Sequence, residues 1–297
     1  MTEEKSKWVK YGAIFAIIIM LGSGVLAVSM LLDDSAEPTE HSLKDIKGPQ
    51  ADFTFKNAKD GVKYLPEGVI NISITRITPG DNISANLDKS FPNVTLDACM
   101  VGIYETGMVE YYSVKDNNNG KIVLSGKPKY DKYGGFNLIR ASVAQRVIVG
   151  DPIIIASFFN YRLDSTLGNK VVDVLTGKAN GATNFNDILS YADDTEIYNE
   201  ITVFKANERS NFSKYYQRSS QYENGTILLE TIVLNPSESM KSDIVKFAEP
   251  SMENATVSVI ENGPAMKIYI TGQDYISFAM KANELYTLTY SHTNQSD

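Results

Sequence analysis

Residues Gly12 to Leu32 (GAIFAIIIMLGSGVLAVSMLL) form an apolar run of 21 residues without a single charge. An α-helix rises about 1.5 Å per residue, so roughly 20 apolar residues span a hydrocarbon core of about 30 Å. The length of the run therefore predicts one transmembrane helix over residues 12–32.

The charges on the two sides of this run differ in sign. Three lysines lie within the first ten residues, whereas Asp33 and Asp34 directly follow the run. Because the cytoplasmic flanks of membrane helices are enriched in lysine and arginine, residues 1–11 are expected in the cytoplasm and the large C-terminal part outside the cell. The sequence thus predicts a single-pass protein of the cell membrane with an extracellular domain.

Two other fates of the run stay open. A cleaved secretory signal usually has an apolar core of about 7–15 residues, and the greater length of this run favours retention. The sequence Lys10-Tyr11-Gly12 directly before an apolar helix resembles the leader of archaeal type IV pilin precursors, which implies a filament subunit cut at Gly12. No glutamate stands at the fifth position of such a mature chain.

The rest of the chain has the composition of a folded protein. Residues 33–51 contain prolines and many charges without apolar periodicity and are expected to form a stalk linker. About 240 residues follow, enough for one large or two small domains. The net charge of −8 argues against nucleic acid as a partner. The only cysteine, Cys99, cannot form an internal disulfide and is predicted to be a small buried side chain.

Strand patterns dominate the folded part. Val69–Ile77, Ala98–Tyr104 and Met108–Val114 are short segments rich in Val, Ile and Tyr. Asn-Gly pairs, which favour tight hairpin turns because both residues accept positive φ, lie between such segments. These pairs are Asn119-Gly120, Asn224-Gly225 and Asn262-Gly263. They predict an antiparallel sheet.

Four segments carry helix signals. They are Pro152–Leu163, Leu167–Leu175, Pro236–Ala248 and Gln273–Glu284. Asp151 and Asn235 occupy N-cap positions, each followed by a proline that suits the first helical turn. The predicted fold class is therefore α+β, with an N-terminal transmembrane helix followed by an antiparallel-sheet ectodomain that has helices on one face.

Two segments of the chain can be aligned with each other. Arg146–Phe158 and Lys267–Phe278 each contain a basic residue, an apolar strand, a glycine, a polar cap and a helix ending in Ser-Phe. This similarity predicts two similar halves, residues 52–180 and 181–290, followed by a tail at 291–297. Strand-to-helix junctions often use glycine, so coincidence is the alternative explanation.

Three motifs carry a family resemblance. Lys63–Ile74 (KYLPEGVINISI), Val147–Pro152 (VIVGDP) and Asp173–Gly177 (DVLTG) resemble uncharacterised membrane-anchored surface proteins of archaea and bacteria. The resemblance covers about residues 60–200 and implies a duplicated α+β ectodomain. That group has no activity to transfer, so the resemblance bears on architecture alone.

Seven Asn-x-Ser/Thr triplets fit the acceptor pattern for N-glycosylation, about twice the number expected from composition. The acceptor candidates are Asn71, Asn82, Asn93, Asn211, Asn224, Asn254 and Asn294. We expect a glycosylated external surface, which agrees with the topology derived from charge. A composition rich in asparagine and threonine is the alternative explanation.

Residues for catalysis are scarce. The two histidines, His41 in the predicted stalk and His292 in the predicted tail, are not expected to be held beside a nucleophile or a metal. No hydrolase or nucleotide-binding motif is found. An acidic stretch supplies the remaining candidates, which are Asp187, Asp193, Asp194 and Glu196. A solvated connection explains them more simply than a calcium site or a glycosidase pair, so the sequence predicts no enzyme, no cofactor and no metal site.

The segment Lys127–Gly135 (KPKYDKYGG) mixes lysines, tyrosines and glycines and is expected to be a loop. Tyr130 and Tyr133 are candidate recognition residues, since tyrosine beside glycine is typical of adaptable binding surfaces. An ordinary loop with its tyrosines packed on the sheet is the alternative.

The predicted function is binding or envelope assembly by an extracytoplasmic domain without catalysis. Its expected partners are the membrane, through residues 12–32, and a protein or envelope component outside the cell, but not nucleic acid. A type IV pilin-like filament subunit is the first alternative. A carboxylate-dependent enzyme acting on envelope glycans is the second.

Overall fold

The computed structural model describes residues 37–48, 53, 55–78, 87–116, 119–125, 127–150, 152–159, 166–249 and 252–293. The chain forms two compact units that separate between Ala182 and Thr183. Unit 1 holds most of the described chain up to Ala182. Unit 2 holds the chain from Thr183 onwards, together with Lys56–Val62 and Ile70–Ile72. The sequence placed this division at 180/181.

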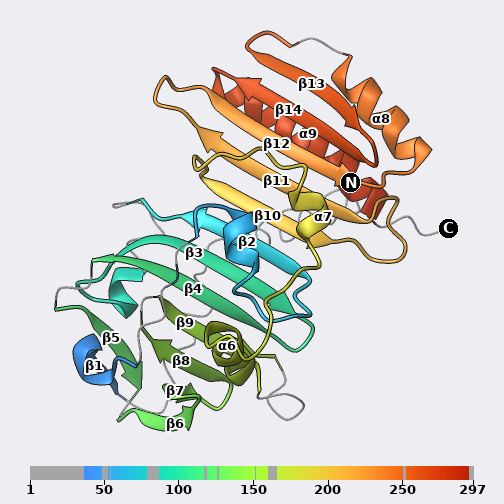
Figure 1. Cartoon of the computed structure of the whole chain (residues 1–297). Coiled ribbons are helices and arrows are strands. Elements are labelled where there is room, and N and C mark those ends of the chain that lie inside the picture. The colour runs from blue at the N-terminus through green and yellow to red at the C-terminus, as the bar shows by residue number, and fades with distance from the viewer. Residues whose placement is uncertain are drawn as a thin grey trace, which may run out of the picture. The chain divides into compact units, whose positions relative to one another are not determined.

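Unit 1 is built on a twisted sheet of antiparallel hairpins (Figure 1). Its strands lie in the spatial order β2 (Asn71–Arg76), β3 (Thr95–Tyr104), β4 (Gly107–Asp116), β9 (Ile153–Phe158), β8 (Gln145–Val149), β7 (Phe136–Ser142) and β6 (Lys129–Tyr133). The first residues of β2 are counted with unit 2. A separate pair is formed by β1 (Pro38–Ser42) and β5 (Lys121–Ser125).

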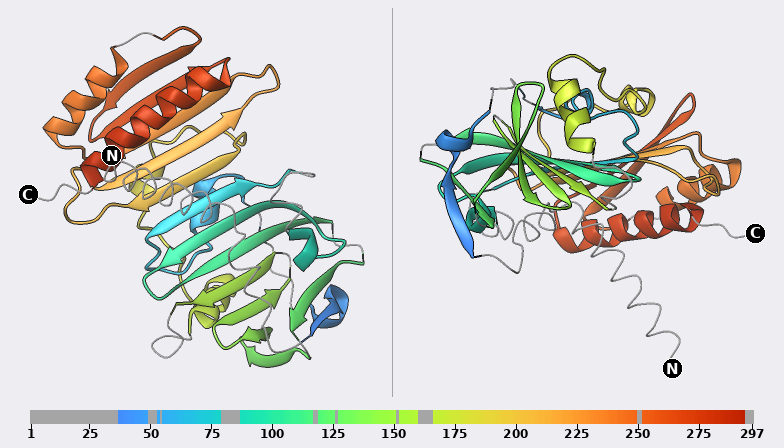
Figure 2. Two further views of the ribbon diagram at one scale, coloured as in Figure 1. Left: turned by 180° about the vertical axis from the view of Figure 1, so that it is seen from behind. Right: turned by 90° about the horizontal axis from the view of Figure 1, so that it is seen from below.

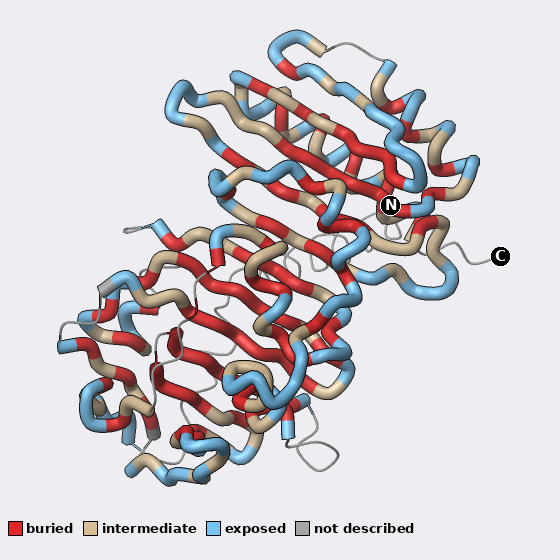
Figure 3. The backbone as a smooth tube through the Cα atoms, in the orientation of Figure 1, coloured by how far each residue is buried: buried red, intermediate tan, exposed pale blue. Residues whose placement is uncertain are grey.

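Both faces of the unit 1 sheet are covered. One face packs against β5, the short helix α3 (Leu43–Ile46) and the segment around Phe91. The other face carries α6 (Leu167–Leu175), which contacts β9. Figure 3 shows the consequence, with the central strands buried along most of their length.

The central strand β9 corrects one prediction. The sequence predicted a helix over Pro152–Leu163, but Ile153–Phe158 is a strand, and all six of its residues are buried. The strand pairs with β4 and with β8. Because this strand is covered on both faces, it is apolar except for Ser157 and lacks the alternation that would distinguish it from a buried helix.

Unit 2 is a five-stranded antiparallel sheet with helices on both faces (Figure 2). The strand order is β13 (Ala255–Asn262), β14 (Ala265–Gly272), β12 (Ile227–Leu234), β11 (Lys214–Gln221) and β10 (Glu200–Lys205). Helices α8 (Glu238–Ala248) and α9 (Tyr275–Thr293) cover one face. On the other lie α7 (Asn186–Leu189), which contacts β11 and β12, and α4 (Ala58–Val62), which contacts α7.

The predicted fold class is wrong. Strands contribute more of the described residues than helices do, so the architecture is mostly β rather than α+β. In unit 2 the helices lie on both faces of the sheet rather than on one. The predicted transmembrane helix, residues 12–32, lies outside the described residues, and no helix within them is long and apolar enough to span a membrane.

The two segments that suggested a duplication adopt different structures. Arg146–Phe158 contains β8 and β9, which form a hairpin. Lys267–Phe278 contains the end of β14 and the beginning of α9. The shared glycine thus precedes a strand in one segment and a helix in the other, which leaves no support for two similar halves.

The turn and helix predictions have mixed outcomes. Asn224-Gly225 and Asn262-Gly263 join paired strands as predicted, with only the glycine at positive φ. Asn119-Gly120 leads from β4 to β5, but β5 pairs with β1. Helix α6 has the predicted bounds. Helix α8 is capped by Ser237 instead of Asn235, because the Ser237 hydroxyl accepts from the backbone of Met240.

Part of the predicted stalk is folded structure. His41 belongs to β1, and Leu43 and Ile46 of α3 are buried in the core of unit 1. The predicted tail also begins too early, because α9 continues to Thr293. The prediction ended this helix at Glu284 and so missed the last turns of α9, although Leu285 and Leu288 continue its apolar spacing.

Candidate functional site

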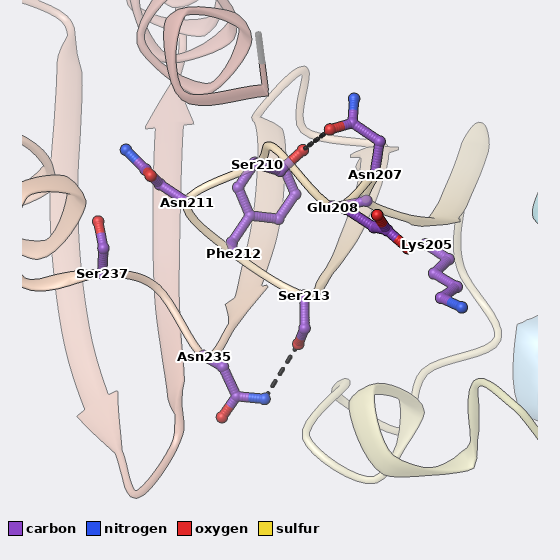
Figure 4. A pocket seen from close by; sticks show the side chains of 10 residues that line it. Lys205, Asn207, Glu208, Ser210, Asn211, Phe212, Ser213, Asn235 and Ser237 are labelled. Atoms are coloured by element: carbon purple, nitrogen blue, oxygen red, sulfur yellow. Dashed lines mark hydrogen bonds between the residues drawn. The ribbon is translucent and has the colours of Figure 1, made fainter. Parts of the chain in front are cut away.

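An open pocket of about 540 Å³ lies at one end of the unit 2 sheet (Figure 4). The connection from β10 to β11 and the connection from β12 to α8 form its walls. The lining residues are Lys205, Ala206, Asn207, Glu208, Ser210, Asn211, Phe212, Ser213, Asn235 and Ser237. Most of these side chains are amides or hydroxyls.

Hydrogen bonds fix this wall to the end of α9. The amide of Asn207 donates to the carbonyl of Thr293 at 3.2 Å, and the hydroxyl of Ser210 reaches the same carbonyl at 3.1 Å. On the other side of the pocket, the amide of Asn235 donates to the hydroxyl of Ser213 at 3.0 Å (Figure 4). The polar wall is therefore held in place before any ligand arrives.

His292 connects the pocket with α8. Its Nδ1 lies 2.9 Å from Nδ2 of Asn211, and its Nε2 lies 3.1 Å from a carboxylate oxygen of Asp243. A carboxylate only accepts, so Nε2 carries a hydrogen and, in a neutral ring, Nδ1 accepts from the Asn211 amide. The His292 side chain is almost fully buried, so the expectation that this residue lies in a loose tail was wrong.

The charges at the pocket come from two exposed side chains, Lys205 and Glu208, on its rim. Phe212 is buried and packs its ring against Phe204 and Tyr215. The accessible chemistry is thus hydrogen bonding by amides and hydroxyls beside one positive and one negative charge. This composition suits recognition of a polar ligand.

A second polar cluster lies on the face of the unit 2 sheet opposite α8 and α9. Arg218 and Tyr269 are the cross-strand neighbours of Glu230, so all three side chains share one face. Lys267 lies on the same face of β14, and Asp193 reaches the cluster from the segment after α7. The Glu230 side chain is fully buried and that of Asp193 is 46% exposed.

Short distances connect these groups. Lys267 Nζ lies 2.6 Å from Asp193 Oδ1 and 3.4 Å from Glu230 Oε1. The Tyr269 hydroxyl donates to Asp193 Oδ2 at 3.1 Å, and the Asp193 backbone amide donates to Glu230 Oε1 at 3.1 Å. Arg218 Nη2 lies 2.9 Å from Glu230 Oε2, although that oxygen has no aligned hydrogen bond within the described residues.

Burial and charge act against each other in this cluster. Burial raises the pKa of Glu230 above its ordinary value, although the charge of Arg218 opposes the shift. Burial also favours neutral Asp193, but the hydrogen bond and charge of Lys267 outweigh it and lower the pKa of Asp193. For Lys267, burial lowers the pKa, whereas bonds to Asp193 and Tyr269 raise it above its ordinary value.

The other acidic candidates do not converge on this cluster. Asp187 pairs with Lys214 at 2.5 Å, and Glu196 pairs with Lys56 on the surface. Within the described part of the chain, no three acidic, histidine or cysteine side chains are grouped as metal ligands would be. These pairs hold the connection that leads into β10.

The predicted recognition loop is largely a hairpin, in which β6 pairs with β7. Tyr130 lies in β6 and is 44% exposed. Tyr133 is engaged, because its hydroxyl contacts both carboxylate oxygens of Asp173 at 3.0 and 3.1 Å. Of the two tyrosines, Tyr130 is exposed and Tyr133 is half-buried.

The glycosylation candidates differ in exposure. Asn93, Asn224 and Asn254 are exposed, whereas Asn71 and Asn211 are half-buried. Asn82 and Asn294 lie outside the described residues. Asn211 also uses its Nδ2 atom, to which a glycan would be attached, in the contact with His292.

Unit 1 contains a buried polar group that no sequence pattern had marked as special. Glu110 in β4 is 1% exposed, and burial raises its pKa to about 8. Cys99 in β3 lies on the same face and is buried, as predicted. Burial raises the pKa of the Cys99 thiol well above its ordinary value, which makes it unreactive.

No protein-family model matches the chain, and no curated protein matches it.

Proposed function

We propose that this protein is an extracytoplasmic binding protein held at the membrane by residues 12–32, and that the pocket of unit 2 binds a polar segment of a protein or envelope partner. The pocket carries this proposal. Its walls are preorganised by hydrogen bonds to α9, and its rim offers Lys205 and Glu208 beside amides and hydroxyls. Preorganised polar groups bind with less loss of conformational entropy on association.

The binding site can be tested by reversing one rim charge. We expect Glu208→Lys in the gently solubilised full chain to weaken cross-linking to its partner at least tenfold. Glu223→Lys is the matched control, because Glu223 is exposed in the turn at the opposite end of β11. Equal cross-linking of the same partner by both variants would exclude the pocket as the binding site.

The location can be tested with cysteine labelling in intact cells. Cys99 is buried, so the native chain should not react with a membrane-impermeant maleimide before denaturation. A Glu223→Cys variant should react in intact cells, and a Glu3→Cys variant only after permeabilisation. Labelling in the reverse order would contradict the proposed topology.

The pilin-like alternative predicts a different N-terminus. A mature chain that begins at Ala13 would support a filament subunit, whereas a chain that begins at residue 1 or 2 supports a retained anchor. The glycan-hydrolase alternative has less support, because both carboxylate oxygens of Asp193 are held by Lys267 and Tyr269.

A further inference from the structure

The polar cluster of unit 2 brings an amine, a carboxyl group and a second carboxyl group together. Lys267 Nζ and Asp193 Oδ1 are 2.6 Å apart, and Glu230 lies within 3.4 Å of the same amine. Glu230 Oε2 is buried and has no aligned hydrogen bond within the described residues, although Arg218 lies beside it. A buried acceptor of this kind calls for an explanation beyond the stability of the fold.

We infer that Lys267 and Asp193 become joined by an intramolecular isopeptide bond, with Glu230 as the group that transfers the protons. The reacting atoms are Lys267 Nζ and Asp193 Cγ. The link would connect the segment after α7 with the strand β14, across 74 positions of the chain.

The reaction balances without an external reactant. A proton moves from the ammonium of Lys267 to Glu230, and the free amine attacks Asp193 Cγ. The new bond between nitrogen and carbon forms while one bond between carbon and oxygen breaks. That oxygen leaves as water with two of the three ammonium protons, one of them delivered by Glu230, and the third stays on the amide nitrogen. No group is oxidised or reduced.

Two neighbouring groups assist the attack, although the ion pair itself favours the charged forms of Lys267 and Asp193 and so opposes the first proton transfer. The Tyr269 hydroxyl donates to Asp193 Oδ2 at 3.1 Å and can stabilise negative charge on that oxygen during the attack. The Asp193 amide bonded to Glu230 Oε1 keeps the second carboxyl group beside the reacting carbon. The loss of one positive and one negative charge leaves Arg218 and Glu230 as a balanced buried pair.

A second lysine–aspartate pair in unit 2 serves as a comparison. Lys214 and Asp187 also lie 2.5 Å apart, with side chains 17% and 51% exposed, close to the 11% and 46% of Lys267 and Asp193. No second carboxylate within the described residues pairs with Lys214. The two lysine–aspartate pairs thus differ mainly in the presence of a buried acid, and only the pair beside Glu230 should react.

An isopeptide bond would give this chain a covalent cross-link that it cannot obtain from cysteine. Its single cysteine excludes an internal disulfide, which is the usual covalent staple of external domains. An amide bond closing a long loop restricts the unfolded chain in the same manner as a disulfide. It also withstands reducing conditions.

The mass of the denatured full chain shows whether the bond between Lys267 and Asp193 has formed. Expression in a host that does not glycosylate keeps the mass simple, since the reaction needs only the folded chain. We expect the wild-type mass to be lower than the sequence mass by one water, with a branched peptide joining Asp193 to Lys267. A full sequence mass for the folded chain, or a loss of water located elsewhere, would overturn the inference.

Single substitutions test the roles of Lys267 and Glu230 in the reaction. Lys267→Arg and Glu230→Gln should each show the full sequence mass, whereas Lys214→Arg should keep the loss of water. A Glu230→Gln chain that folds and still forms the bond would remove Glu230 from the mechanism. If that variant does not fold, the branched peptide of the wild type still decides whether the bond exists.

Discussion

The backbone of Gly181 lies so close to the carbonyl of Lys63 that a Cβ atom at position 181 would be 1.6 Å from that oxygen. The contact accompanies a bridge between Gly181 and Pro66. Because backbone atoms form both sides of this contact, Gly181→Ala can be accommodated only by moving one segment of unit 1. We expect a loss of about 2–4 kcal/mol in the free energy of unfolding, measured by urea denaturation.

Gly168 provides the matched control in the same unit. A Cβ atom there would meet Leu138 and Arg146 at 3.4–3.8 Å, which is ordinary contact. Since Gly168 lies in α6, Gly168→Ala should stabilise the protein by up to about 1 kcal/mol. Equal effects of both substitutions would show that the close approach at Gly181 is wrong.

Glu110 should make unit 1 sensitive to pH. Burial raises the folded-state pKa of this carboxyl group to about 8, whereas it ionises near its ordinary value of 4.5 in the unfolded chain. Between these values the unfolded state binds fewer protons, so stability falls as the pH rises from about 4.5 to about 8. Glu110→Gln should flatten this dependence and stabilise the protein at pH 8 by on the order of a few kcal/mol.

The control for this prediction is Glu105→Gln, at an exposed position in the turn between β3 and β4. The urea midpoints of the wild type, Glu110→Gln and Glu105→Gln would be measured from pH 4 to pH 9 and compared. A wild-type curve that rises across this range, or one that Glu105→Gln flattens equally, would contradict the assignment to Glu110.

The contacts of His292 with Asn211 and Asp243 should stabilise both the end of α9 and the wall of the pocket. We expect His292→Ala to cost about 1–3 kcal/mol, because a buried side chain loses both of its polar contacts. Hydrogen exchange of residues 207–213 should also become faster. Ser291→Ala, at the exposed neighbouring position, should leave this exchange unchanged; accelerated exchange there too would point to general fraying of the helix.

Glycosylation should distinguish the sequons by geometry. Asn224 is exposed in a turn, where its Oδ1 accepts from the amide of Thr226 and leaves Nδ2 open. Asn211 uses Nδ2 in the contact with His292. In a glycosylating host we expect glycopeptides at Asn224 but an unmodified Asn211 in the wild type; a fully occupied Asn211 would contradict the described contact.

Local signals predicted the elements whose ends are marked by individual residues. Gly177, at positive φ, follows α6, and the turns at Gly225 and Gly263 join neighbouring strands as expected. Ile153–Phe158 failed because burial on both faces removes the periodicity on which the prediction depends. Asn119-Gly120 failed because the sequence does not show that β5 pairs with β1 instead of β4.

The two sites were harder to predict than the local elements. Their residues are brought together by the pairing of strands and helices that lie far apart in the sequence. Asp193 was a candidate, but its neighbours Lys267 and Glu230 are set by how β12 and β14 align. The pocket combines two strand connections with the end of a helix. His292 could have been found, since Leu285 and Leu288 continue the apolar spacing of α9 towards it.

The burial of β9 on both faces has a consequence for synthesis. Five apolar residues and Ser157, without a charge, form a segment that would associate with other chains if it stayed exposed. Its partners β4 and β8 both precede it in the chain, with β8 only a short turn away. Each partner has therefore left the ribosome before β9 emerges, so both strand edges with which this apolar segment pairs are synthesised before the segment itself.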